Sequence, residues 1–424
     1  MQDEDEYGTR ALGALRTREV PAPHVDVAAV TRAGRARERA RWAGGGVAVA
    51  AATAVALVAA PVLLSGVGGP GAQPADRGAA TAAAAPGEPD PAPDALVCTP
   101  QRLPVPTGAQ APVITGVDPT GRYLAGALGQ VDDANPGRAL LWTDGQLSVL
   151  APPGTSAEAV AVNSAGVVVG KSLRAGRSFG WVYRNGTYSE LAPPSGLVAV
   201  PVAINERGDI AGWAWAAGDG NETAVVWAAD RPATARRLTA AGPAIASDIA
   251  DDGTVVGTLG DGTRPYVWAP DGTGRPLAGP DSQSTGKVLA VAGPWAYGWA
   301  GTATSPPVAR SAPSSPPAGG TAKDKNEAGS VPRWVRWHLP TGQVEVLSGI
   351  DPAGINATGL VVGTLGSAQT GGPAVLRDGA PVALPRLEER YNRGTASVIS
   401  DDGRTIAGDN WANDAPGELV RWRC

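Results

Sequence analysis

The sequence predicts an all-β fold, and two observations lead to this prediction. From residue 97 onward, short apolar segments alternate with turns that contain glycine, asparagine or aspartate. A similar pattern also returns about every 42 to 45 residues. Long amphipathic helical patterns are almost absent from the same region, which argues against an α/β enzyme fold.

Each repeat has an apolar strand, a turn with glycine, a second strand ending in glycine and a variable stretch. A strand that usually ends in tryptophan and a strand ending in leucine follow, and four strands per repeat are typical of β-propeller blades. Seven copies align, with first strands that begin near residues 113, 159, 201, 244, 287, 354 and 396. We therefore expect a seven-bladed β-propeller over residues 97–424. A six-bladed ring with an irregular cap is the alternative, because the fifth copy is the most degenerate.

The two ends of this region predict how the ring closes. The last copy stops at Cys424 before a fourth strand, whereas CTPQRLP at 98–104 has the shape of a fourth strand without three strands before it. We expect this N-terminal strand to complete the seventh blade. Because neighbouring strands lie about 5 Å apart, Cys98 and Cys424 would then be within disulfide reach. Two free or intermolecular thiols are the alternative.

Three copies carry a resemblance to a known family. AVAVNSAGVVVG at 159–170, PVAINERGDIAG at 201–212 and GINATGLVVG at 354–363 resemble the HAF-repeat family of extracellular propeller-like proteins, as does the strand that follows each. The His-Ala-Phe triplet that names the family is absent, and ALLW, AVVW and PYVW occur instead. The resemblance implies a fold and an extracellular location, and it implies no reaction.

An uncharged stretch of 25 residues, 43–67, is long enough for a helix that crosses the membrane. Five arginines lie at positions 32 to 41, and the next basic residue is Arg77, which predicts a cytoplasmic N-terminus. We expect a basic tail at 1–42, a single span at 43–67, a Pro/Ala/Gly-rich linker at 68–96 and an extracytoplasmic propeller. The Ala, Gly, Pro and Arg excess is typical of an actinobacterial genome.

Residue types limit the chemistry. His24 and His338 are the only histidines, so no histidine-based triad or metal site can form outside the membrane, and we expect no catalytic residue, metal or cofactor. The pairs Asp251–Asp252 and Asp401–Asp402 precede glycine in a turn, where aspartate bonds the local backbone. A glycosidase or lyase that uses Asp251 and Asp402 is the enzymatic alternative.

The tryptophans fall into two groups. Six recur near the end of the third strand and are interpreted as blade packing: Trp142, Trp181, Trp227, Trp268, Trp337 and Trp422. Four follow the glycine of the second strand, where the repeats vary most, and are candidate ligand-binding residues: Trp213, Trp215, Trp299 and Trp411. The alternative for the second group is that these rings cover the ends of the blades.

These observations favour a non-catalytic, membrane-tethered propeller that binds a protein or glycan outside the cell. The alternative is a signalling protein whose tail binds a cytoplasmic regulator such as a sigma factor, although the histidine and cysteine zinc ligands of anti-sigma domains are absent from 1–42. Residues 302–332 interrupt the fifth repeat and are expected to form a flexible loop. A net charge of −5 makes nucleic acid an improbable partner.

Overall fold

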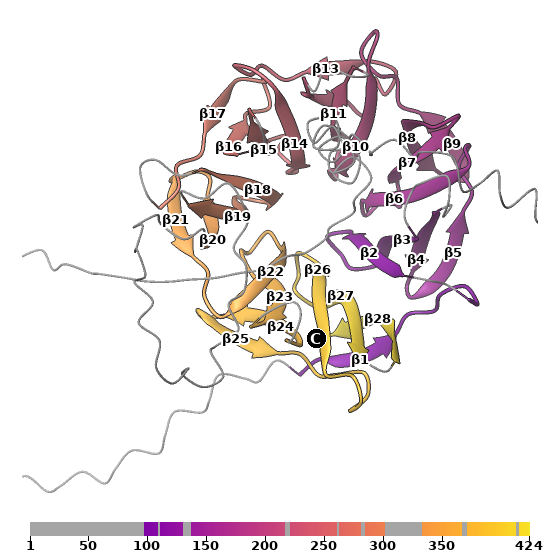
Figure 1. Ribbon diagram of the computed structural model, residues 1–424, viewed down its shortest axis with the longest axis vertical. Coiled ribbons are helices and arrows are strands. Elements are labelled where there is room, and N and C mark those ends of the chain that lie inside the picture. The colour runs from indigo at the N-terminus through magenta and orange to yellow at the C-terminus, as the bar shows by residue number, and fades with distance from the viewer. Residues whose placement is uncertain are drawn as a thin grey trace, which may run out of the picture. The chain divides into compact units, whose positions relative to one another are not determined.

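The computed structural model describes residues 97–108, 111–129, 137–216, 221–260, 263–280, 285–301, 333–366, 371–412 and 415–424. Every secondary-structure element assigned in these residues is a β-strand, and the strands form seven antiparallel four-stranded sheets. The sheets are arranged as blades around a ring (Figure 1). The predicted seven-bladed propeller is confirmed, and the six-bladed alternative is wrong.

Blade 1 contains β2 (Pro112–Val117), β3 (Tyr123–Leu128), β4 (Arg138–Thr143) and β5 (Gln146–Leu150). Blade 2 contains β6 (Ser156–Val162), β7 (Val168–Arg174), β8 (Arg177–Arg184) and β9 (Thr187–Glu190). Blade 3 contains β10 (Val198–Ile204), β11 (Ile210–Trp215), β12 (Thr223–Trp227) and β13 (Ala235–Arg237). Blade 4 contains β14 (Ala244–Ile249), β15 (Val255–Leu259), β16 (Arg264–Trp268) and β17 (Gly274–Pro276).

Blade 5 contains β18 (Thr285–Ala292), β19 (Trp295–Gly301), β20 (Arg333–His338) and β21 (Gln343–Val346). Blade 6 contains β22 (Ile350–Ile355), β23 (Val361–Leu365), β24 (Pro373–Arg377) and β25 (Ala380–Ala383). Blade 7 contains β26 (Arg393–Ile399), β27 (Thr405–Ala412), β28 (Ala415–Arg423) and β1 (Thr99–Arg102).

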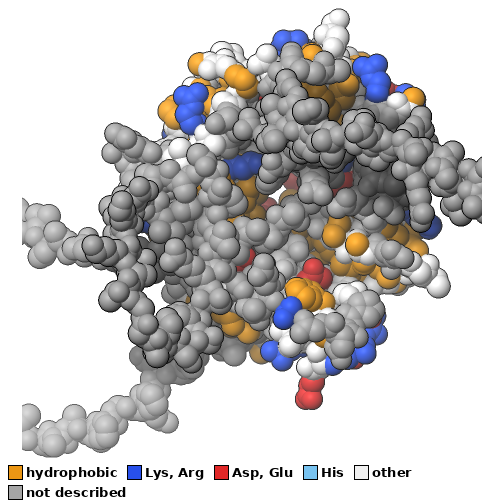
Figure 2. Space-filling model, in the orientation of Figure 1, with side chains coloured by type: hydrophobic (Ala, Val, Ile, Leu, Met, Phe, Trp, Pro, Cys, Tyr) orange, Lys and Arg blue, Asp and Glu red, His pale blue; other side chains and the backbone are white. Residues whose placement is uncertain are grey.

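The first strand of each blade lies nearest the centre of the ring and the fourth strand lies at the outer margin (Figure 1). The outer strands are short, and some carry exposed arginines, such as Arg236 and Arg237 in β13. Figure 2 shows Lys and Arg side chains at this margin. Short, charged edge strands disfavour pairing with another chain, so the outer edges are protected against aggregation.

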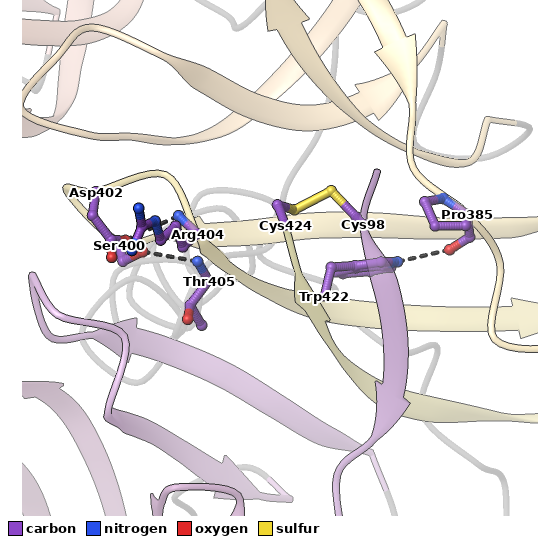
Figure 3. The surroundings of a disulfide bond; sticks show 8 residues. All are labelled: Cys98, Pro385, Ser400, Asp402, Arg404, Thr405, Trp422 and Cys424. Carbon is purple, nitrogen blue, oxygen red and sulfur yellow. Dashed lines mark hydrogen bonds between the residues drawn. A yellow bond between two sulfur atoms is a disulfide. The ribbon is translucent and has the colours of Figure 1, made fainter. Parts of the chain in front are cut away.

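Blade 7 is built from both ends of the described chain. The first strand, β1, pairs antiparallel with β28, and Thr99 lies opposite Arg423. A disulfide links Cys98 and Cys424, 326 residues apart in sequence, directly beside this pair (Figure 3). The strand pairing and the disulfide both join the two ends that the repeat pattern leaves incomplete.

A repeated tryptophan contact joins each of five blades to the blade before it. The indole Nε1 donates to the carbonyl one residue after the leucine that ends the preceding fourth strand, at 2.7 to 2.8 Å. The donor and acceptor pairs are Trp142 and Pro104, Trp227 and Ala192, Trp268 and Thr239, Trp337 and Ala278, and Trp422 and Pro385. Pro104 follows β1, so β1 has the same contact with blade 1 as other fourth strands have with their successors.

Burial confirms the packing role of all six repeated tryptophans, because each is at most 1% exposed. Trp181 differs in register, since it lies opposite Gly170, whereas the other five lie opposite the residue two positions before the glycine. A Cβ on Gly170 would approach the Trp181 ring to 2.2 Å. The glycine of the second strand therefore leaves the space that the tryptophan ring occupies.

Asparagine in the first turn of a blade joins that blade to the next one. Asn205 Oδ1 accepts from the backbone N–H of Asp209 at 2.9 Å, and its Nδ2 donates to the carbonyl of Ala250 in blade 4 at 3.1 Å. Asn163 and Asn356 make the equivalent pair of bonds in blades 2 and 6. These three side chains are at most 2% exposed, so both of their polar atoms are satisfied inside the protein.

Blades 4 and 5 have alanine, Ala250 and Ala292, where this asparagine would stand, and other groups connect them. Between blades 4 and 5, the N–H of Val291 donates to Asp248 Oδ2 at 2.8 Å. Between blades 5 and 6, the Tyr297 hydroxyl donates to the carbonyl of Ala353 at 2.6 Å. Blades 1 and 7 also lack the asparagine, with Asp118 and Ser400 at its position, so blades 4, 5 and 6 are connected by contacts of their own.

The tail, membrane span and linker expected at 1–96, and the insertion at 302–332, lie outside the described residues. Among the residues that are described, no helix is long and apolar enough to span a bilayer.

Removal of the disulfide should destabilise the propeller. A C98S/C424S variant is expected to lose up to about 6 kcal/mol of unfolding free energy, because the cross-link constrains a very long loop in the unfolded chain. Guanidinium titration of the oxidised wild type and the variant measures the difference. Equal unfolding midpoints would contradict this role of the disulfide.

Loss of an inter-blade asparagine should also lower stability. N205A leaves the Asp209 N–H and the Ala250 carbonyl without their partner, at a cost of about 1–3 kcal/mol for each buried group. Thermal unfolding measures the effect, and N185G, in an exposed turn where the backbone already has φ of 50°, is the matched control. A decrease in the unfolding temperature of N205A no larger than that of N185G would show that the Asn205 contact contributes little.

Candidate binding cleft between blades 4 and 5

The ring has two ends with different structures. The turn face carries the turn between the first and second strands of each blade and the turn between its third and fourth strands. The link face carries the connections between second and third strands and the links from one blade to the next. All turns of the turn face lie within the described residues, for example 205–209 and 269–273. The turn face is therefore described completely.

The candidate tryptophans lie toward the link face, and two of them come together. Trp213 and Trp215 are both in β11, and their ring centroids are 4.5 Å apart. Trp213 is 8% exposed and Trp215 is partly exposed. The second strand continues past its glycine, Gly212, so Trp213 packs inside the blade instead of projecting from its end.

The other two candidates lie in different blades. Trp299 is 4% exposed, lies opposite Trp334 and packs in a cluster with Ile350 of blade 6. Trp411 of β27 is partly exposed, and the Arg393 guanidinium lies over its ring at 5.0 Å. β11 and β27 are on opposite sides of the ring (Figure 1). The structure does not gather the four rings into one exposed cluster, and burial assigns Trp213 and Trp299 to packing.

The paired aspartates serve their turns, as the sequence indicated. Asp252 Oδ1 accepts from the N–H of Thr254 at 2.7 Å, and Asp402 Oδ1 accepts from the N–H of Arg404 at 2.9 Å. Asp402 also accepts from the Ser400 hydroxyl (Figure 3). Equivalent backbone bonds in two blades explain why aspartate is favoured at this position.

The first aspartate of each pair connects neighbouring blades. Asp251 Oδ1 accepts from the N–H of Glu206 at 3.0 Å, and Asp401 Oδ1 accepts from the N–H of Ala357 at 2.8 Å. All four carboxylates thus have a structural role that accounts for their presence. Among the described residues, no group of three or more His, Cys, Asp or Glu side chains is placed to hold a metal ion.

A cleft of about 600 Å³ lies on the turn face between blades 4 and 5. This volume is within the range of pockets that bind small ligands or short segments of chain. Residues from both turns of both blades form its walls: Ala250, Asp251, Asp252, Thr254, Val267, Ala269, Thr273, Gly274, Arg275, Gly293, Pro294, Leu339 and Pro340. The repeat pattern of the sequence does not predict this cleft.

The short first turn of blade 5 accounts for the cleft. In blade 2, five residues separate the paired residues Val162 and Val168, whereas in blade 5 four separate Val291 and Ala296. The strands of blade 5 continue to the pair Ala292 and Trp295, and only Gly293 and Pro294 remain for the turn. This compact turn occupies less space beside blade 4 than an asparagine turn does.

The two walls of the cleft differ in chemistry. The blade 5 wall is apolar, with Pro294, Leu339 and Pro340, and the N–H of Leu339 donates to the Pro294 carbonyl at 2.8 Å, which joins its two turns. The blade 4 wall carries the exposed carboxylates of Asp251 and Asp252. The cleft is therefore suited to a ligand that combines apolar surface with positive charge.

Arg275 is the basic residue among the lining residues. Its Nη2 donates to the Leu339 carbonyl at 3.0 Å, so the guanidinium reaches from the outer strand of blade 4 to blade 5. Asp251 belongs to the first turn of blade 4, near the centre of the ring. The cleft thus runs outward from an acidic inner end to a basic outer end.

Several carboxylates lie close to one another around the centre of the turn face. Burial raises the pKa of Asp401, and the negative charges of Asp251, Glu206 and Asp402 raise it further. Asp248, at the boundary of blades 4 and 5, is surrounded by protein in the wall of the ring, and this removal from water raises its pKa to about 7. The charge of Asp251 acts in the same direction.

No protein-family model and no curated protein matches the chain. Among solved structures, the chain is similar to puromycin hydrolase, with a TM-score of 0.50 and 14% identity over 74% of this chain and 52% of that chain. For virginiamycin B lyase from Staphylococcus aureus, the TM-score is 0.48 and the identity is 12% over 77% of this chain and 99% of that chain. For the β-propeller domain of the Trilobed protease from Pyrococcus furiosus, the TM-score is 0.48 and the identity is 10% over 74% of this chain and 94% of that chain. These identities show the propeller fold alone.

The raised pKa of Asp248 predicts a pH-dependent stability. Because the folded pKa of about 7 exceeds the ordinary value of 3.8, the folded state holds the proton more tightly, and stability falls as pH rises from about 4 through 7. D248N cannot ionise and should remove this pH-dependent loss. Its single oxygen can accept from only one of the two N–H groups that the carboxylate bonds, those of Ile249 and Val291, so its net gain at pH 8 should be below about 4 kcal/mol. Thermal unfolding at pH 5 and pH 8 measures it.

D252N, at an exposed turn carboxylate, is the control for the same pH series. An advantage of D248N over wild type that does not grow between pH 5 and pH 8 would contradict the assignment.

Proposed function

We propose that this protein is a membrane-tethered, extracytoplasmic β-propeller that binds a protein or glycan partner without catalysing a reaction. The cleft between blades 4 and 5 is the observation that carries the proposal. In this cleft a concave shape, an apolar wall and exposed turn carboxylates occur together. The propeller supplies a rigid frame for this cleft, because both walls are turns held by strands.

The proposed location rests on the sequence and on the disulfide. The uncharged stretch 43–67 follows an arginine-rich segment, which favours a cytoplasmic N-terminus and a propeller on the other side of the membrane. Disulfides persist in oxidising compartments, and a Cys98–Cys424 bond is consistent with such a location. The proposed span would attach to blade 7 through residues 68–96.

We also infer that β1 closes the ring. The pairing of β1 with β28, the disulfide and the contact of Trp142 with Pro104 support this inference. An ion-pair network adds to them, since Arg102 of β1 contacts Glu388 at 2.6 Å and Glu418 at 3.2 Å. If β1 closes the ring next to the linker, a force applied through residues 68–96 would act on the Cys98–Cys424 disulfide before it acted on the blades.

The alternatives gain less support. Binding of a cytoplasmic regulator rests on residues 1–42, which lie outside the described residues. A carboxylate-dependent glycosidase or lyase needs Asp251 and Asp402 as reacting groups, and both accept structural hydrogen bonds in turns of different blades, blade 4 and blade 7.

Filling the cleft should abolish partner binding. A photo-crosslinking residue at Thr273 in the full-length protein should form a discrete adduct in cells, and T254W should remove that adduct by occupying the cleft. Denaturing electrophoresis under reducing conditions measures the adduct. W215A and W411A, on the link-face side, should leave it unchanged.

A photo-crosslinking residue at Thr187, in the outer turn of blade 2, provides the positional control. Adducts that persist in T254W, or that form equally from Thr187, would contradict the cleft as the binding site. Loss of the adduct in W215A or W411A would place binding on the link face instead.

A further inference from the structure

The cleft favours a polypeptide over a glycan, and this inference rests on the proposed function. We propose that the cleft binds an extended peptide segment in which a lysine or arginine lies beside leucine or proline residues. The basic side chain would lie against Asp251 and Asp252, and the apolar residues would pack on Pro294, Leu339 and Pro340. The partner is thus a protein that presents an exposed basic and apolar segment.

The apolar wall is the first argument for a peptide. Sugar rings are commonly recognised by stacking on flat aromatic side chains, and the described residues that line the cleft include none. The aliphatic surfaces of Pro294, Leu339 and Pro340 suit the branched and cyclic side chains of leucine and proline. Contact with them excludes water from both surfaces, which supplies the non-directional part of the affinity.

Charge is the second argument. Asp251 and Asp252 are exposed on the blade 4 wall, and Asp251 lies close enough to Asp401 of blade 7 for its negative charge to raise the pKa of Asp401. Basic residues do occur nearby. The Arg207 guanidinium lies next to Gly253, and its Nε is 3.3 Å from Asp209 Oδ2. Arg207 comes from blade 3, so it lies on the side of the blade 4 turn away from the cleft.

Two further arginines border the same sector. Arg236 of blade 3 donates to the Pro270 carbonyl at 3.2 Å, again behind the blade 4 turns. Arg275 lines the cleft, but its guanidinium already contacts the Leu339 carbonyl at the outer end. A basic side chain is therefore attracted to the inner end and repelled from the outer one, which fixes the register of the segment.

The exposure of the two aspartates sets the expected size of the effect. Ion pairs between exposed charges contribute little to binding, so neutralising one carboxylate should weaken binding by at most about two- to fivefold. Reversing the ligand's charge replaces attraction by repulsion toward both aspartates and should have a larger effect, about tenfold or more.

The test uses the full-length protein and a fluorescein-labelled peptide, Gly-Ala-Pro-Leu-Arg-Pro-Ala-Gly, followed by fluorescence anisotropy at low salt. We expect saturable binding, about two- to fivefold weaker binding to D252N, and about tenfold or weaker binding of the peptide with Glu in place of Arg. D402N is the matched control, because it changes the equivalent aspartate of the blade 7 turn, and it should bind as wild type does. Asparagine retains the turn's oxygen acceptor, and thermal unfolding checks that both variants fold.

Three results would overturn the inference: no binding of the arginine peptide at about 1 mM, equal binding of the glutamate peptide, or equal loss in D252N and D402N. Chitohexaose and xylohexaose provide the glycan arm. Binding of either sugar that T254W abolishes, without peptide binding, would keep the cleft as the site and reject the peptide. Adduct formation that T254W does not affect would instead reject the proposed function itself.

Discussion

The contact between a tryptophan and the carbonyl that leaves the preceding blade is the interaction on which the ring depends. A four-stranded sheet has two apolar faces, and each can be buried only against a neighbouring blade. The indole ring fills that interface over the repeat glycine, and its N–H donates to a carbonyl at the end of the preceding blade, so the buried ring keeps a partner for its polar group. In five blades, burial and polar satisfaction are thus achieved by one residue.

The same contact explains why the N-terminal strand matters. Trp142 of blade 1 donates to Pro104, which follows β1, so blade 1 has a normal predecessor only when β1 is in place. The Leu103 N–H donates to the Leu419 carbonyl, as Leu238 does to Ala224 within blade 3. The proposed closure therefore uses the contacts of an ordinary blade, and the disulfide adds a covalent restraint to them.

The proposed function arises where the repeat is least regular. The asparagine contact is replaced at blades 4 and 5, by Asp248 at one boundary and Tyr297 at the other. The compact Gly293–Pro294 turn leaves room there, and the cleft lies beside it. Regular turns pack closely from blade to blade, so a departure from the repeat is a natural origin for a concave binding surface.

Much of the fold could be predicted from the sequence because blade geometry is imposed by local periodicity. The tryptophans at the end of the third strand and the unpaired CTPQRLP segment were informative for that reason. Trp213 and Trp299 follow the glycine of the second strand, which makes them candidates for a binding surface if that strand ends at the glycine. β11 and β19 continue beyond it, to Trp215 and Gly301, so these rings lie inside the blades.

The cleft could not be predicted in this way, since its shape depends on side chains from two blades that are distant in sequence. Its one local signal was present: Ala250 and Ala292 replace asparagine, and a short Gly-Pro turn follows. Such departures from a repeat indicate where the spacing between blades changes, but not which residues then face one another.

Closure of the ring by β1 is most directly tested by hydrogen exchange, followed by mass spectrometry, on the full-length protein with the disulfide intact and after reduction. If β1 closes the ring, amides of β1 and of the paired part of β28 should stay protected in both states, because strand pairing and the Trp142 contact hold β1 in place. Rapid exchange of β1 after reduction, with the other blades still protected, would contradict this closure: β1 would then be held by the disulfide alone, and the ring would not need it as a strand.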